Sequence, residues 1–303
     1  MSESTTNRVV SGPEGVWPRA GRTDSTDPAT VTLAVDQPEM DHPEAARPGS
    51  DKKAVCHPML DYPDTAQAGT AGMAQWVSDP WLGFDTETTG VSPTCDRIVT
   101  AATVTRFSTG VTETKSWLIN PQVPIPARAT AVHGISTEYA SSNGQDPREG
   151  LDQISEVLAN HMSQGRIIVV FNAGFDLPLL EADSKRHGVK SLSERLDGEV
   201  APVADPLVLD RALDRYRKGK RTLADVALAY GIAVPEDTHQ AHVDSILALE
   251  VLGAILDRYP SLGAMSLSEL HQYQRDSHSR WAEDFQKFLA SKGKTSQISR
   301  VWF

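Results

Sequence analysis

The stretch from Trp81 to Gly90 constrains the fold of this chain most, because a short apolar run ends there in two carboxylates and a glycine-marked turn. Its apolar side chains alternate with Gly83 and Asp85 at the two-residue period of a β-strand. Asp85 and Glu87 therefore leave the backbone on the same face, where both can bind one cation. Two carboxylates ~5 Å apart repel each other by about 3 kcal/mol at an effective dielectric of ~20, so a cation or a proton must relieve them. A solvated turn is the alternative reading of such a pair.

The composition indicates one domain of ordinary size with additional sequence. A chain of 303 residues with 39% hydrophobic content can bury one sizeable core. Its formal net charge of -11 argues against coating nucleic acid or an anionic membrane by charge alone, although an acid cluster that binds divalent ions is itself a source of negative charge. The two cysteines, Cys56 and Cys95, suggest neither a disulfide framework nor structural zinc. No segment has the features of a membrane span or a signal peptide, so we expect a cytoplasmic protein without membrane association.

The chain divides into three parts by composition. Residues 1–75 are rich in Pro, Ser, Thr, Asp, Glu and Gly, and we expect them to form a disordered N-terminal arm. From residue 76 to residue 258 the composition is that of a packed domain. Residues 259–303 carry apolar residues at helical spacing and are predicted to form a helical C-terminal extension.

The packed part predicts three strands before its first long helix. Residues 97–107 are β-branched and nearly uncharged, and residues 111–119 follow a turn, which together with the first strand predicts an antiparallel meander. Apolar residues at helical spacing within 151–162 predict a helix on the sheet. Residues 166–171 form an uninterrupted apolar strand of the type that helices bury on both faces, and a short fifth strand follows within 201–209. We therefore predict an α/β fold with a mixed five-stranded sheet and helices on both faces.

Two later segments supply further candidate site residues. Asp176 follows the strand at 166–171, where catalytic carboxylates of α/β enzymes collect, and Asn172 is predicted to cap the next helix. A first-turn acid favoured by the helix dipole explains Asp176 equally well. His239 and Asp244 would lie ~140° apart on one continuous helix. Both reach a common site only if His239 lies in the loop before the helix begins.

A local basic cluster stands out in this acidic chain, between residues 211 and 221. Most charge runs are solvated faces, but beside an acid cluster this one is a candidate for contact with a nucleic-acid backbone. Its members are Arg211, Arg215, Arg217, Lys218, Lys220 and Arg221.

Taken in chain order, these motifs resemble those of the 3′-to-5′ exonuclease superfamily of the ribonuclease H fold. The branch is the DEDD type with a histidine, which is related to the epsilon subunit of bacterial DNA polymerase III. The resemblance covers about residues 77–258, and the segment around Arg217 is similar to that of actinobacterial exonucleases. It covers neither the arm nor the C-terminal extension. The residues that carry the resemblance are Phe84 to Gly90, His133 to Ile135, Asn172 to Asp176, and the spaced His239, Ala241 and Asp244.

The resemblance implies a ribonuclease H-like sheet and a role for each site residue. Two divalent ions, Mg²⁺ or Mn²⁺, would be bound by Asp85, Glu87, Asp176 and Asp244. His239 would be the general base, and histidine suits removal of a proton near neutral pH. Two hard cations can lower the pKa of the attacking water and stabilise the leaving oxygen of a phosphodiester.

At the terminal nucleotide, the resemblance implies contacts from Thr88, His133, Asn172 and Phe175. Phe175 would stack on the terminal base, a contact that tolerates any sequence. Packing in the core is the alternative for Phe175, and a structural or solvent-facing role is the alternative for His133.

The expected function is a metal-dependent 3′-to-5′ exonuclease that releases nucleoside monophosphates from single-stranded DNA, in proofreading or repair. A close alternative is an exoribonuclease that trims RNA 3′ ends, because the same catalytic set serves both. A different class is a non-catalytic subunit bound to a DNA polymerase. Loss of an acid or of His239 would favour that class, and none is lost.

Overall fold

A computed structural model describes residues 72–235 and 239–303 of the chain. Residues 1–71, which make up most of the predicted arm, lie outside the described residues. The first described residues already contact the domain, because the Ala74 amide donates to the Gly263 carbonyl at 2.7 Å. Trp76 is buried in a short 3₁₀ helix, η1 (Gln75–Val77). Packed structure is therefore present from about residue 74.

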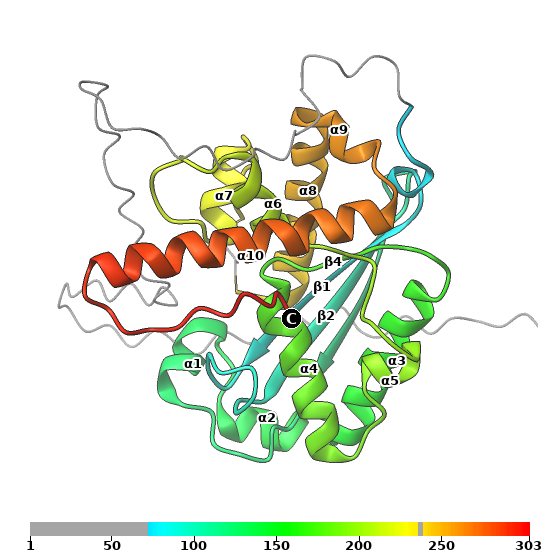
Figure 1. Ribbon diagram of the computed structural model, residues 1–303. Helices are drawn as coiled ribbons and strands as arrows, with labels where there is room; N and C mark the ends of the chain where they lie inside the picture. The colour runs from blue at the N-terminus through cyan, green and yellow to red at the C-terminus, as the bar shows by residue number, and fades with distance from the viewer. Residues whose placement is uncertain (1–71, 236–238) are drawn as a thin grey trace, which may run out of the picture. The chain divides into compact units, whose positions relative to one another are not determined.

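A mixed five-stranded sheet lies at the centre of the fold, in the order β3-β2-β1-β4-β5 (Figure 1). The first three strands form the predicted antiparallel meander, and β4 and β5 run parallel to β1. The apolar run at 166–171 forms ladder pairs over only two residues, because the chain turns into a helix soon afterwards. The strands are β1 (Trp81–Thr88), β2 (Ile98–Arg106), β3 (Thr112–Leu118), β4 (Ile168–Val169) and β5 (Val203–Ala204).

Helices cover both faces of the sheet, as the sequence predicts. On one face α3 and α4 contribute Leu151 and Leu180 to a core cluster, and on the other α8 contributes Leu249 and Leu252. Within the described residues, no helix has the length and apolar character that a membrane span requires. The helices are α1 (Ala127–His133), α2 (Thr137–Asn143), α3 (Pro147–Met162), α4 (Ala173–His187), α5 (Leu192–Leu196), α6 (Pro206–Leu213), α7 (Leu223–Ala229), α8 (Ala241–Arg258), α9 (Pro260–Gly263) and α10 (Leu267–Ser291).

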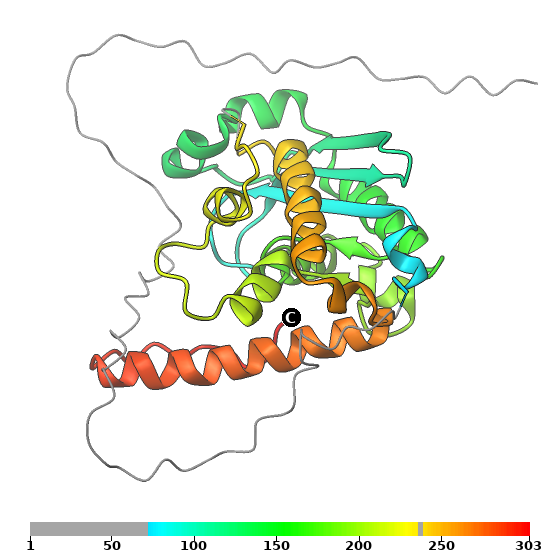
Figure 2. The same ribbon diagram turned by 90° about the horizontal axis from the view of Figure 1, so that it is seen from above.

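The close contact between α8 and β1 depends on Gly83. A Cβ atom added to Gly83 would lie 2.8 Å from the Ser245 carbonyl oxygen and 3.1 Å from the Leu249 side chain. Only glycine permits this approach without a shift of the helix. Figure 2 shows α8 lying across the strands. Because Ser245 follows Asp244 directly, the contact brings Asp244 close to the carboxylates of β1.

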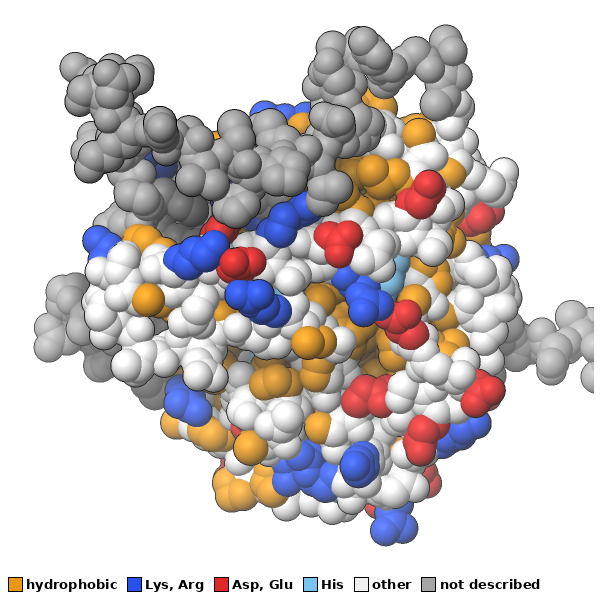
Figure 3. All heavy atoms as spheres, viewed as in Figure 1, with side chains coloured by type: hydrophobic (Ala, Val, Ile, Leu, Met, Phe, Trp, Pro, Cys, Tyr) orange, Lys and Arg blue, Asp and Glu red, His pale blue; other side chains and the backbone are white. Residues whose placement is uncertain are grey.

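Two arginines of the basic segment form internal ion pairs, which corrects its interpretation as a backbone contact at these two positions. Asp210 is completely buried on α6, and its Oδ2 atom accepts from the guanidinium groups of Arg217 and Arg221. Arg221 is only 8% exposed. Lys218 and Lys220 are exposed. On the face that carries α10, basic and acidic side chains are interspersed rather than gathered by sign (Figure 3).

We predict that Arg221→Ala lowers the free energy of unfolding by about 3 kcal/mol, because it leaves the buried Asp210 charge undercompensated. Lys220→Ala is the matched control and should change stability by less than about 0.5 kcal/mol. Urea unfolding followed by circular dichroism measures both. Equal unfolding midpoints for the two variants would contradict the ion-pair role of Arg221.

Candidate active site

Three chain segments meet at the end of β1 and bring together the acids that the sequence predicts. Asp85 and Glu87 lie on β1, Asp176 lies in the first turn of α4, and Asp244 lies in the first turn of α8. A hydrogen bond of 2.6 Å from Thr86 Oγ1 to Asp176 Oδ1 joins β1 to α4. The strand therefore supplies two acids and fixes the position of a third.

The pKa values of all four carboxyl groups are raised, mainly by burial, and the charges of other acids of the group add to the shifts of Asp85 and Glu87. Burial raises the pKa of Asp85 well above its usual value, and the charges of Asp176, Asp244 and Glu87 raise it further. The pKa of Glu87 is raised well above its usual value by burial, then by Asp244 and Asp176. Burial raises the pKa of Asp176 to about 7, and it also raises that of Asp244, although the charge of His239 opposes the second shift.

The donor set fits divalent cations with a preference for oxygen ligands. Among the described residues, none of the ion pairs joins a Lys or Arg side chain to Asp85, Glu87, Asp176 or Asp244. Asp176 is buried and the other three are half-buried, and carboxylates withdrawn from water without a basic partner require another positive charge. Carboxylate oxygens are the ligands that Mg²⁺ and Mn²⁺ prefer. These four residues are therefore the ones that could hold such ions.

His239 lies beside the acids, in the loop that precedes α8, as predicted. The helix begins at Ala241, and His239 has a left-handed backbone with φ of 75°. Its backbone amide donates to Asp244 Oδ2 at 3.3 Å. Three side chains, those of Glu87, His239 and Asp244, each place one possible ligand atom within 4.8 Å of the other two. His239 itself is exposed. This group, as found among the described residues, includes His239 but not His242.

Three of the predicted nucleotide contacts, Thr88, His133 and Phe175, are half-buried. His133 ends α1 and is half-buried, and its Nδ1 accepts from the Ile135 amide at 3.1 Å. Burial lowers the pKa of His133, a hydrogen bond with the Thr88 backbone opposes the shift, and the charge of His239 lowers the pKa further. Thr88 Oγ1 donates to the Gly90 carbonyl at 2.6 Å. Phe175 is partly buried against the core, which leaves stacking and core packing both open.

The predicted capping role of Asn172 is wrong. Asn172 occupies the N-cap position of α4 with φ of 65°, but its side chain makes no capping hydrogen bond. The Asp205 carboxylate accepts from the amides of Asn172 and Ala173 instead, both at 2.9 Å. Asp205 was not singled out from the sequence. The signal for it was the Asp205-Pro206 pair, which is typical of an N-cap followed by proline at the first helical position.

Comparison with known protein families agrees with this geometry. Residues 82–252 match the family described as Exonuclease. The chain is 33% identical over 192 residues to a DNA polymerase III subunit epsilon-like protein of Rhodobacter capsulatus, covering 61% of this chain and 24% of that protein. It is 26% identical over 190 residues to a PolC-type DNA polymerase III of Caldanaerobacter subterraneus, covering 62% of this chain and 12% of that polymerase. The chain thus spans a quarter or less of the length of these relatives.

Solved structures with the same fold include two forms of exonuclease I. The enzyme from Methylocaldum szegediense aligns with a TM-score of 0.53 at 19% identity, over 67% of this chain and 46% of that one. A zinc-bound complex of the E. coli enzyme with single-stranded DNA aligns with a TM-score of 0.52 at 19% identity. The alignment covers 67% of this chain and 43% of that one. These alignments confirm the ribonuclease H-like fold.

We predict that Mg²⁺ at ten times its Kd stabilises the protein by about 1.4 kcal/mol, which corresponds to a rise in Tm of about 3 °C. Asp85→Asn should raise the Tm of the metal-free protein, because it removes a half-buried charge that three others repel. The same substitution should reduce the rise with Mg²⁺.

Differential scanning calorimetry with Mg²⁺ and with EDTA measures both effects. Asp257→Asn, at an exposed position on α8, is the matched control and should behave as the parent. An equal Mg²⁺-induced rise in Asp85→Asn and the parent would contradict the site.

Proposed function

Because the chain belongs to the exonuclease family through its residues 82–252, we propose that it is a metal-dependent 3′-to-5′ exonuclease acting on single-stranded DNA. Family membership makes the protein a nuclease. The 3′-to-5′ polarity of cleavage, the single-stranded DNA substrate and the dependence on metal ions are what we propose beyond that. The observation that supports it most is the group of four carboxylates, one buried and three half-buried, that lies beside an exposed histidine, with Asp176 tied to β1 and one ligand atom each of Glu87, His239 and Asp244 within 4.8 Å of one another.

Asp85, Glu87, Asp176 and Asp244 would hold two divalent cations. When bound, such ions lower the pKa of a coordinated water and neutralise charge on the phosphate. The carboxyl groups must be ionised to bind a cation, and their raised pKa values mean that protons compete for the same oxygens. Cation affinity should therefore increase with pH.

His239 is the proposed general base. Its left-handed backbone turns the chain before α8, so that the imidazole returns to the carboxylates of Glu87 and Asp244. The neutral imidazole would accept a proton from the attacking water, and its exposure would let the proton pass to solvent. This role needs a position close to the acids, which His239 has two residues before α8 begins.

Single-stranded DNA is the proposed substrate because of the proteins with which the chain shares its fold. The structure of the E. coli exonuclease I relative is described as a complex with single-stranded DNA, and the sequence relatives are named as DNA polymerase III proteins. Phe175 is partly exposed beside Asp176 and would stack on the terminal base, and His133 would contact the terminal nucleotide. A DNA polymerase is a candidate partner on the same grounds.

The decisive assay uses single-stranded DNA and RNA labelled at either end, with Mg²⁺, Mn²⁺ or EDTA. We predict that 3′-labelled DNA yields a labelled mononucleotide at the earliest times, whereas 5′-labelled DNA yields a ladder that shortens progressively. EDTA and Asp176→Asn should abolish both. A ladder from RNA alone would favour the exoribonuclease, and cleavage that persists in EDTA would overturn the metal-dependent mechanism.

A second prediction separates His239 from His242. His239→Ala should lower kcat by about 10² to 10⁴-fold at neutral pH, the usual range for a missing general base, and should recover part of the activity as pH rises. Mn²⁺ binding should persist, because all four carboxylates remain. His242→Ala is the control and should stay within a few-fold of the parent. A collapse confined to His242→Ala would mean that the base is assigned wrongly.

A further inference from the structure

One buried carboxylate, that of Asp205, joins the starts of two helices. Asp205 is 1% exposed and follows β5 directly. Its Oδ1 atom accepts from the amide of Asn172 at 2.9 Å and from that of Leu207 at 3.0 Å, and its Oδ2 atom accepts from that of Ala173 at 2.9 Å. It therefore caps α4 and α6 at once. An ionised acid at a helix N-terminus also interacts favourably with the helix dipole.

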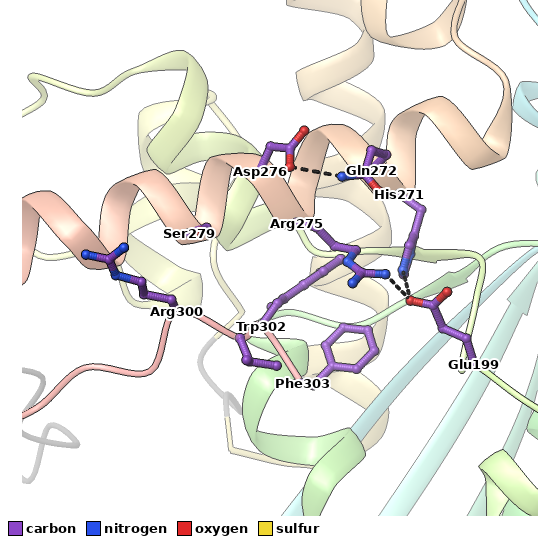
Figure 4. A pocket seen from close by; sticks show the side chains of 10 residues that line it. Glu199, His271, Gln272, Arg275, Asp276, Ser279, Arg300, Trp302 and Phe303 are labelled. Carbon is purple, nitrogen blue, oxygen red and sulfur yellow. Dashed lines mark hydrogen bonds and ion pairs between the residues drawn. The ribbon is translucent and has the colours of Figure 1, made fainter.

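A tryptophan from the far end of the described chain completes this arrangement. Trp302 Nε1 donates to Asp205 Oδ2 at 3.2 Å across 97 positions of sequence. Trp302 is 7% exposed, and its ring lies 5.4 Å from that of His271 and 4.5 Å from that of Phe303. Figure 4 shows the side chains of Trp302 and Phe303 beside α10, where they line a cavity of about 260 Å³. We call residues 292–303, which follow α10, the strap.

The backbone of the strap also lies against the first turn of α4. A Cβ atom added to Gly174 would lie 2.7 Å from the Trp302 carbonyl oxygen. Asp176 follows two residues later, and its carboxylate is held from the other side by the 2.6 Å hydrogen bond from Thr86. The first turn of α4 is thus held between β1 and the strap.

Helix α10 fixes the same region through Gln274. Its Oε1 atom accepts from the Asp205 amide at 2.7 Å, and its Nε2 atom donates to the Val203 carbonyl at 2.8 Å. Gln274 is completely buried. Both α10 and the strap lie outside residues 82–252, the part that matches the exonuclease family. A segment beyond the family match therefore supports one of the four acids.

We propose that Trp302 is a positioning residue, which sets the position of Asp176 through Asp205 and the first turn of α4 and thereby sets the affinity of the acid cluster for divalent cations. This inference rests on the proposed function in treating the acids as cation ligands. Hydrogen-bonded partners that hold metal ligands in place typically change metal affinity by about 10 to 100-fold when they are removed. Trp302 acts through two intermediates, so the lower end of that range applies.

The test compares Trp302→Phe with Trp281→Phe in the full chain. The first substitution keeps an aromatic ring and removes the N–H that Asp205 accepts. The second removes an indole nitrogen that has no hydrogen-bond partner within the described residues, from a ring stacked on Phe285. Calorimetric titration with Mn²⁺ measures cation affinity, cleavage of single-stranded DNA gives kcat and KM, and thermal melting reports the fold.

We expect Trp302→Phe to bind Mn²⁺ about tenfold more weakly and to lower kcat, with KM for DNA within about twofold of the parent. Trp281→Phe should match the parent in Mn²⁺ affinity and in cleavage, and its melting temperature reports the loss of the cation–π contact with Arg211. Gly174→Ala is a second variant, because its methyl group would displace the Trp302 carbonyl, and it should weaken Mn²⁺ binding in the same way.

Parent-like Mn²⁺ affinity in a folded Trp302→Phe protein would overturn the inference. Loss of the fold in both Trp302→Phe and Gly174→Ala would also overturn it, because the strap would then serve stability alone. A parent that binds Mn²⁺ but cleaves neither DNA nor RNA would defeat the proposed function while leaving the Mn²⁺ comparison valid.

Discussion

The repulsion among four carboxylates, Asp176 buried and the other three half-buried, is the constraint on which the rest of this structure depends. Each pair at ~5 Å costs about 3 kcal/mol at an effective dielectric of ~20, and burial adds the loss of hydration. Asp176 and Asp244 each lie in the first turn of a helix, where the helix dipole stabilises a carboxylate by typically about 0.3 to 1 kcal/mol. This stabilisation is smaller than the repulsion between one pair of carboxylates. The site therefore requires additional positive charge, which divalent cations can supply.

Packing elsewhere in the molecule holds this unfavourable cluster together. Gly83 lets α8 approach β1 closely enough to bring Asp244 to the strand, and Thr86 ties Asp176 to the same strand. Asp205 fixes the start of α4 from the opposite side with two backbone hydrogen bonds. The acids thus lie on elements whose positions are set by the core. Rigid placement of this kind keeps ligands in position for a cation before it binds.

Local patterns in the sequence predicted the meander of three strands, because each strand follows from spacing within a few residues. Spacing also required His239 to lie before the helix if it is to share a site with Asp244, whereas the choice of the four acids came from the resemblance to the exonuclease superfamily. Contacts between distant segments were missed. Trp302 and Asp205 are 97 positions apart and carry no shared local pattern. The role of Arg221 in the basic segment was misread for a related reason, since Arg221 faces a buried acid whose position depends on the packing of α6. The charges in a sequence do not by themselves distinguish basic residues that form an internal ion pair from basic residues on a solvated surface.

The most direct test of the two-cation site is a crystal structure with Mn²⁺ and a mononucleotide, using anomalous scattering to locate the ions. We predict two peaks about 3.5 to 4 Å apart, bounded by Asp85, Glu87, Asp176 and Asp244, with the imidazole of His239 bound to neither. The contradicting result is a single ion held by the nearby group of Glu87, His239 and Asp244, with Asp176 bonded only to Thr86. In that case His239 would be a ligand and not a base.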